Sequence, residues 1–240
     1  MVNLVNKLGF IMGGSGSDNV KVRQVRKIGP TRRSVSGSYQ FRGKEAIQYE
    51  STLERDFLIR HEFFPNIVSI TPQPVEIPFI GDNGRAYTYT PDFLMSLRYL
   101  DGEATQHVLV EVKPRDLWVE NWRAWSSKWK AARRFARNQG WSFKIYDESR
   151  IRDRALENIK FLDRYQRFAQ APGHTDTLQH ALYQIGPLSR DALFAHCGVI
   201  AGAERPWVVA IWYLLATRKI DCDITQQLDG TTVLWTLQNG

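Results

Sequence analysis

The sequence has few cysteines and no long apolar run. Its two cysteines, Cys197 and Cys222, are not spaced as metal ligands, so we expect reduced thiols and no zinc site. No apolar stretch approaches the roughly 18 residues that a membrane-spanning helix needs. Residues 1–12 are too polar for a secretory signal. These absences exclude disulfide-stapled, zinc-bound and membrane-spanning classes, and they predict a cytoplasmic protein that does not contact membranes.

Acidic residues are scarce at the beginning of the chain. The net charge is +7 over 240 residues, and residues 1–49 hold nine Lys or Arg but only two acids. We therefore predict that residues 1–45 form a basic, partly flexible arm that binds phosphate without reading sequence. A solvated tail and a contact for an acidic protein surface are the alternatives. The arm residues predicted to contact DNA are Arg32, Arg33, Arg42 and Lys44.

The rest of the chain is organised around residues 90–113, TPDFLMSLRYLDGEATQHVLVEVK. A Pro-Asp pair that ends in Asp92 precedes one apolar run, and the triplet from Glu111 to Lys113 ends the next. If the two runs pair as a β-hairpin, Asp92 and Glu111 could hold a divalent cation. Lys113 shares a face with Glu111, so the hairpin predicts the site of a metal-dependent nuclease. In such a site Lys113 would reach the scissile phosphate or the attacking water. A solvated cross-strand pair of charges is the alternative.

A helix is predicted over residues 49–64, where apolar side chains recur every three or four positions. Ser51 and Glu54 have the spacing of a capping box at its start. Glu50 and Glu54 lie one turn apart, so either could supply a third carboxylate to the site. Residues 67–80 and 86–97 are predicted as strands around a turn, and with the hairpin they give a mixed sheet.

A basic helix is predicted after the hairpin. Tryptophans at 118, 122, 125 and 129 are expected to face the core. Another face gathers basic residues, and no acid occurs from residue 121 to residue 146. We predict that this face contacts the DNA backbone, with a merely solvated face as the alternative. The residues concerned are Arg123, Lys130, Arg134 and Arg137.

Two domains are predicted after the arm. A strand at 141–146 and a helix at 151–168 complete a nuclease domain over residues 46–170. A linker signal at 171–173 begins a second unit, residues 171–240, whose pattern of helices followed by two short strands is typical of a winged-helix domain. Its third helix, residues 204–217, is mostly apolar, which favours protein docking over the reading of bases.

Several blocks of the sequence, taken in order, resemble the TnsA endonucleases, the 5′-strand-cutting subunits of heteromeric bacterial transposases. The blocks are residues 32–37 (RRSVSG), 48–57 (QYESTLERDF), 73–74 (QP), 89–93 (YTPDF) and 111–113 (EVK). The resemblance implies an α/β, restriction-endonuclease-like PD-(D/E)xK fold, a mixed sheet flanked by helices, with a C-terminal winged-helix-like domain.

The resemblance also implies the chemistry of the site. It assigns catalysis to Glu54, Asp92, Glu111 and Lys113, the three acids being metal ligands, and it leaves Glu50 and Gln73 as candidate supporting residues. Some members carry Gln where this chain has Glu111. The implied cofactor is Mg²⁺, for which Mn²⁺ is expected to substitute.

The resemblance implies partners as well. They are double-stranded DNA at transposon ends, a TnsB-like DDE transposase and a TnsC-like AAA+ ATPase, all in the bacterial cytoplasm at the nucleoid. A CRISPR-associated transposon is one setting in which such a subunit occurs. A stand-alone restriction or repair nuclease and a non-catalytic DNA-binding scaffold remain as alternatives.

Overall fold

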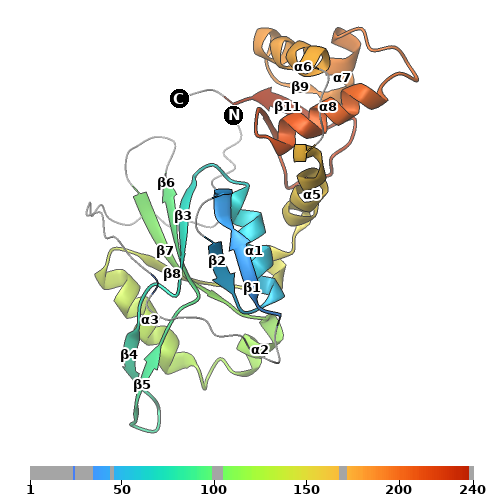
Figure 1. Ribbon diagram of the computed structural model, residues 1–240. Coiled ribbons are helices and arrows are strands. Elements are labelled where there is room, and N and C mark those ends of the chain that lie inside the picture. The colour runs from blue at the N-terminus through green and yellow to red at the C-terminus, as the bar shows by residue number, and fades with distance from the viewer. Residues whose placement is uncertain (1–23, 25–34, 44–45, 99–104, 168–171, 238–240) are drawn as a thin grey trace. The chain divides into compact units, whose positions relative to one another are not determined.

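The computed structural model describes residues 24, 35–43, 46–98, 105–167 and 172–237, and the chain divides into two compact units between Arg152 and Asp153 (Figure 1). The linker signal in the sequence predicts the division near residue 170. The difference arises because helix α5 (Arg154–Asp163) belongs to the second unit, where Asn158 donates a hydrogen bond of 2.9 Å to the carbonyl of Ile224.

The first unit alternates strands and helices. In chain order its elements are β1 (Gly37–Gln40), η2 (Phe41–Gly43), β2 (Ala46–Tyr49), α1 (Thr52–Glu62), β3 (Ile67–Pro72), β4 (Ile77–Ile80), β5 (Ala86–Tyr89), β6 (Phe93–Arg98), β7 (Thr105–Val112), α2 (Arg115–Glu120), α3 (Ser126–Asn138), β8 (Ser142–Tyr146) and α4 (Glu148–Ile151).

The central sheet has the strand order β3-β6-β7-β8. The first two pairings are antiparallel and the β7–β8 pairing is parallel, so the predicted mixed sheet is confirmed. The two predicted strands at 67–80 and 86–97 are each divided in two. The division arises because β4 and β5 leave the central sheet and pair with each other. Pro74 and Pro91 lie at these divisions, where a residue without an N–H cannot continue a ladder.

Helices α1 and α3 cover opposite faces of this sheet (Figure 1). On one face, the fully buried Phe57 of α1 stacks on Phe93 of β6 with ring centroids 5.3 Å apart. On the other face, Ala132 of α3 packs in one cluster with Leu94 and Leu109. Because successive side chains of a strand point to opposite faces, this arrangement fixes which strand residues face α3.

The four tryptophans predicted to face the core do so only in part. The predicted helix is broken by a turn at residues 121–125, between α2 and α3. Trp129 is buried at 5% exposure, whereas Trp122 is 53% exposed, so the prediction of a core position was wrong for Trp122. The turn is the physical reason, since it takes Trp122 out of helical register with Trp129.

The second unit is mostly helical. After α5 its elements are η3 (Arg164–Arg167), α6 (Pro172–Ile185), β9 (Leu188–Ser189), α7 (Arg190–His196), α8 (Arg205–Ala216), β10 (Ile220–Cys222) and β11 (Val233–Thr236). The strands form an antiparallel sheet in the order β10-β11-β9. Helix α8 buries Ile211, Leu214 and Leu215 completely and therefore forms the core of this unit. No helix within the described ranges is long and apolar enough to cross a bilayer.

Candidate active site

The β6–β7 hairpin positions two acids at the end of the sheet. Its antiparallel register pairs Phe93 with Val110, and continuing that register by one residue places Asp92 opposite Glu111. Val110 and Val112 are buried on the α1 side, so Glu111 and Asp92 face the α3 side. The predicted hairpin is confirmed, and it gives the two acids one common face.

Glu111 is almost completely buried, at 2% exposure, but it has three partners. Its Oε2 accepts a hydrogen bond of 2.6 Å from the hydroxyl of Tyr89. Its Oε1 lies 3.5 Å from the ammonium nitrogen of Lys113 and 3.8 Å from that of Lys128. Burying a carboxylate costs free energy unless the group is paired and hydrogen-bonded, so these three partners offset the cost of burying Glu111.

Asp92 is buried beside other acids, and its partners only partly offset the cost of a negative charge there. Burial raises the pKa of Asp92 well above its usual range, and the charges of Glu111 and Glu54 raise it further. The opposing contributions come from Lys113 and from the backbone N–H of Val112, which donates to Oδ2 at 2.7 Å. A bound divalent cation would relieve this excess of negative charge, since cations favour ionised neighbouring carboxyls.

Glu54 forms one half of the predicted capping box at the start of α1, because its backbone N–H donates to Ser51 Oγ at 3.1 Å. Its side chain reaches one residue further back than the box requires, and Oε2 accepts from the backbone N–H of Glu50 at 2.8 Å. Burial is the main cause that raises the pKa of Glu54, and the charge of Glu50 adds to it. Glu54 in turn raises the pKa of Asp92 and of Lys113. This coupling favours Glu54 over Glu50 as the helical acid of the site.

Lys113 is held as an ammonium group. Burial lowers the pKa of Lys113, but the charges of Glu111 and Asp92 outweigh burial, and the net pKa is raised. The backbone N–H of Lys113 donates to the carbonyl of Tyr146 at 3.0 Å, which anchors it beside β8. A lysine with a raised pKa stabilises negative charge and does not accept a proton at neutral pH.

Gln73 has three unusual features. Its side chain is 5% exposed, its Oε1 is buried without a hydrogen-bond partner, and its backbone has a φ of 43°. A left-handed conformation in a residue other than glycine costs about 1–3 kcal/mol and is often found at functional sites. The backbone N–H of Gln73 donates to the carbonyl of Asp92 at 2.8 Å, which ties this residue to the acidic end of β6.

Lys128 was missed by the sequence analysis. Its ammonium nitrogen lies beside Glu111 and within 4.6 Å of the ring centroid of Trp125, 5.1 Å of Tyr89 and 5.7 Å of Trp129. Burial lowers the pKa of Lys128, with Glu111 opposing that effect. Its place between Trp125 and Trp129 in the sequence was the available signal, because a lysine on a tryptophan-rich face is turned inward with its neighbours.

The predicted DNA-contacting residues divide into three groups. Those on or before α3 are exposed and form no ion pair with any described residue: Arg123, Lys130, Arg134 and Arg137. Arg42 instead has a structural contact, because its Nη2 donates to the carbonyl oxygens of Glu62 and Phe64 at the end of α1. Arg32, Arg33, Lys44 and most of the predicted arm lie outside the described residues.

The donor set fits a hard divalent cation, although its present arrangement is not a preformed cage. Carboxylate oxygens are the ligands that Mg²⁺ prefers, and Gln73, whose backbone is bonded to Asp92, carries a neutral side-chain oxygen without a hydrogen-bond partner. Within the ranges that the structure describes, no group of three or more His, Cys, Asp or Glu is gathered closely enough to hold a metal as it stands. The lysines on Glu111 and the capping bonds of Glu54 occupy oxygens that a cation would use.

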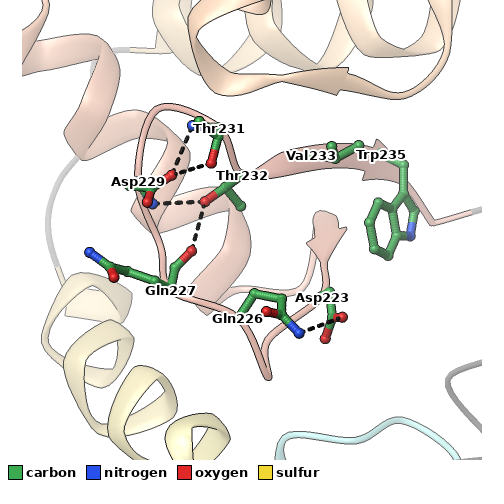
Figure 2. Close-up of a pocket in the computed structure, with 8 residues that line it drawn as sticks. All are labelled: Asp223, Gln226, Gln227, Asp229, Thr231, Thr232, Val233 and Trp235. Carbon is green, nitrogen blue, oxygen red and sulfur yellow. Dashed lines mark hydrogen bonds between the residues drawn. The ribbon is translucent and has the colours of Figure 1, made fainter.

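A separate pocket of about 400 Å³ lies in the second unit (Figure 2). Its two carboxylates are engaged by neighbouring hydroxyls, as where Asp229 Oδ1 accepts from Thr231 Oγ1 at 2.7 Å. Among the described residues no lysine or arginine lines it, so it lacks the pairing of acid with ammonium group found at the hairpin site. The lining residues are Asp223, Gln226, Gln227, Asp229, Thr231, Thr232, Val233 and Trp235.

Comparison with known families supports the reading of the hairpin. Residues 64–148 match the family described as TnsA-like endonuclease N terminal, and the resemblance drawn from the motifs is thereby confirmed for this stretch. The matched stretch includes Gln73, Asp92, Glu111, Lys113 and Lys128. It indicates a nuclease domain of the kind associated with transposition, on a mixed α/β fold compatible with that of endonucleases. No curated protein matches the chain significantly.

Proposed function

We propose that this chain is a Mg²⁺-dependent DNA endonuclease that cuts the 5′ strands at transposon ends. The observation that carries the proposal is the group formed by Glu54, Asp92, Glu111 and Lys113. The charges of Glu54, Glu111 and Lys113 act on the pKa of Asp92, and those of the three acids act on the pKa of Lys113. Asp92, Glu111 and Lys113 lie within the stretch that matches a TnsA-like endonuclease domain. Two carboxylates beside a lysine are the parts that metal-assisted phosphodiester hydrolysis requires.

In this proposal each residue has one role. Asp92 and Glu111 would hold the cation, and Glu54 would complete the carboxylate set. A bound Mg²⁺ supplies Lewis acidity and lowers the pKa of a water ligand. Lys113 orients the water and stabilises the charge that develops on the phosphate oxygens, because its raised pKa keeps it protonated. Mn²⁺ would substitute, since it accepts the same oxygen ligands.

The surroundings of the site suit a DNA backbone. Lys128 of α3 reaches Glu111, and the exposed basic residues lie on the outer side of the same helix, because Lys130 follows Lys128 by two residues, about 200° of helical rotation. A duplex that enters the site beside Lys128 and follows α3 would bring its phosphates to Lys130, Arg134 and Arg137. Such contacts position DNA without reading bases, so specificity would come from the partner transposase.

We also propose that the second unit is a winged-helix domain that docks a partner protein. The order α6, β9, α7, α8, β10, β11 with an antiparallel sheet is the order of that fold. Its third helix, α8, buries its apolar side chains in the core of the unit. This leaves few groups on α8 for reading bases, and it favours docking of a TnsC-like ATPase on this unit. A TnsB-like transposase would cut the other strands, and both partners would be cytoplasmic.

The test is strand-resolved cleavage of labelled transposon-end DNA with Mg²⁺, by the chain alone and with TnsB-like and TnsC-like partners. Asp92→Ala is expected to abolish cleavage while DNA binding and folding persist. Retained cutting by Asp92→Ala would refute the assignment of the site. Cutting of both strands by the chain alone would favour a stand-alone nuclease over a transposition subunit. Unchanged cleavage products when the wild-type chain is omitted would favour a non-catalytic scaffold.

A further inference from the structure

Lys128 occupies an unusual position for a lysine on a surface helix. Its side chain is 19% exposed, less than the 30% of Lys113. The ammonium group lies over three aromatic rings, those of Trp125, Tyr89 and Trp129. Each ring attracts the ammonium group through the negative potential of its face. The rings therefore hold the charge at the site whether or not Glu111 is available to it.

Two ammonium groups share one oxygen in this structure. Oε1 of Glu111 lies 3.5 Å from Lys113 and 3.8 Å from Lys128, while Oε2 accepts from Tyr89. A divalent cation bound through Glu111 must take an oxygen that these groups now occupy, and its charge repels both lysines. Lys128 comes from a different element, α3, and has three rings to rest on after it leaves the carboxylate.

The charges of the site explain what Lys128 would bind next. Glu54, Asp92 and Glu111 as carboxylates, with two ammonium groups, leave one net negative charge. A divalent cation turns this into one net positive charge, which is opposite to that of a phosphodiester. Without Lys128 the same sum is zero, so the attraction for the substrate phosphate depends on this residue.

We propose that Lys128 is a second lysine of the active site, which rests on Glu111 before a cation binds and contacts a backbone phosphate of the DNA afterwards. This inference rests on the proposed function of the same site. The alternative is that Lys128 only neutralises Glu111 and packs against Trp125, a structural role that involves neither the cation nor the DNA.

The test uses Lys128→Met, which keeps the length of the side chain and removes its charge, and Lys128→Arg, which restores a charge. Lys144→Met is the matched control, because Lys144 pairs with Val110 in register and so lies on the other face of the sheet. Mn²⁺ affinity is measured by titration calorimetry without DNA. Lys128→Met is expected to bind Mn²⁺ about tenfold more tightly, since a competing charge-assisted contact is gone, and Lys144→Met is expected to bind it as the wild type does.

The second readout is the salt dependence of DNA binding, measured with Mn²⁺ in a Lys113→Ala background, which is expected not to cut. The slope of log affinity against log salt should fall by about one for Lys128→Met, the value for one lost phosphate contact, and recover for Lys128→Arg. Tighter Mn²⁺ binding with an unchanged slope would mean that Lys128 competes with the cation for Glu111 but does not contact the DNA, and it would overturn the proposal. Unchanged or weaker Mn²⁺ binding by Lys128→Met would also overturn it, whereas failure of the wild type to bind Mn²⁺ would reject the proposed function itself.

Discussion

Replacing Asp92 with asparagine should separate metal binding from folding. Asn keeps the shape of the side chain, and its amide oxygen can still accept the 2.7 Å hydrogen bond from the N–H of Val112. The end of the β6–β7 hairpin should therefore survive. What disappears is one charge of a group in which burial, Glu111 and Glu54 all raise the pKa of Asp92.

The expected stability of the metal-free protein follows from that raised pKa. Between the ordinary value of 3.8 and the raised folded value, the folded state binds a proton that the unfolded state releases. The stability of the wild type therefore falls as the pH rises through this window, because its slope follows the difference in bound protons. Asp92→Asn removes this contribution, so at neutral pH it should be as stable as the wild type without metal, or more so.

The metal response should change in the opposite way. A cation at one hundred times its dissociation constant stabilises the wild type by about 2.7 kcal/mol. For a chain of this size that corresponds to a rise in Tm of roughly 5–11 °C. Asp92→Asn should lose most of this rise, and Asp82→Asn, an exposed acid in the β4–β5 turn, should keep it. The assay is thermal unfolding with and without Mn²⁺, and an equal rise in Asp92→Asn would refute the placement of the cation.

Three further predictions concern the frame of the site. Phe57→Ala should lower the free energy of unfolding by about 3–5 kcal/mol in a denaturant titration, because a fully buried ring stacked on Phe93 is lost; a loss under about 1 kcal/mol would contradict this packing. Ser51→Ala should cost about 1 kcal/mol through loss of the N-cap of α1, and an unchanged melting temperature would count against the cap. Cys222 should resist a thiol reagent at pH 8 in the folded protein but not in guanidinium, because burial raises the pKa of Cys222 to about 12; rapid native labelling of Cys222 in a Cys197→Ala variant would disagree.

The hairpin could be predicted because its signals are local. Asp92, Glu111 and Lys113 lie within one short segment whose two apolar runs and polar turn specify the pairing, and the register then follows from side-chain alternation. The capping box of Glu54 was equally local, because Ser51 lies three residues before it. The parallel addition of β8 and the unit to which α5 belongs depend on contacts distant in sequence, which no local pattern contains.

Apart from its place between two tryptophans, nothing in the sequence assigned Lys128 to the site, for a related reason. Its approach to Glu111 depends on how α3 lies on the sheet, and the break at residues 121–125 sets that position. The same break exposed Trp122, which an uninterrupted helix would have buried. The positive φ of Gln73 lies likewise at the bend between β3 and β4, where the chain leaves the central sheet, and the prolines signalled this bend only in part.

The most direct test of the central claim is strand-specific cleavage of transposon-end DNA with TnsB-like and TnsC-like partners, comparing the wild type with Lys113→Ala in Mg²⁺. Lys113→Ala removes the ammonium group at the carboxylates and leaves the other strand's enzyme intact. We expect the 5′-strand cuts to disappear while 3′-strand cutting and joining continue. Wild-type levels of 5′-strand cutting by Lys113→Ala would contradict the assignment of this hairpin as the nuclease site.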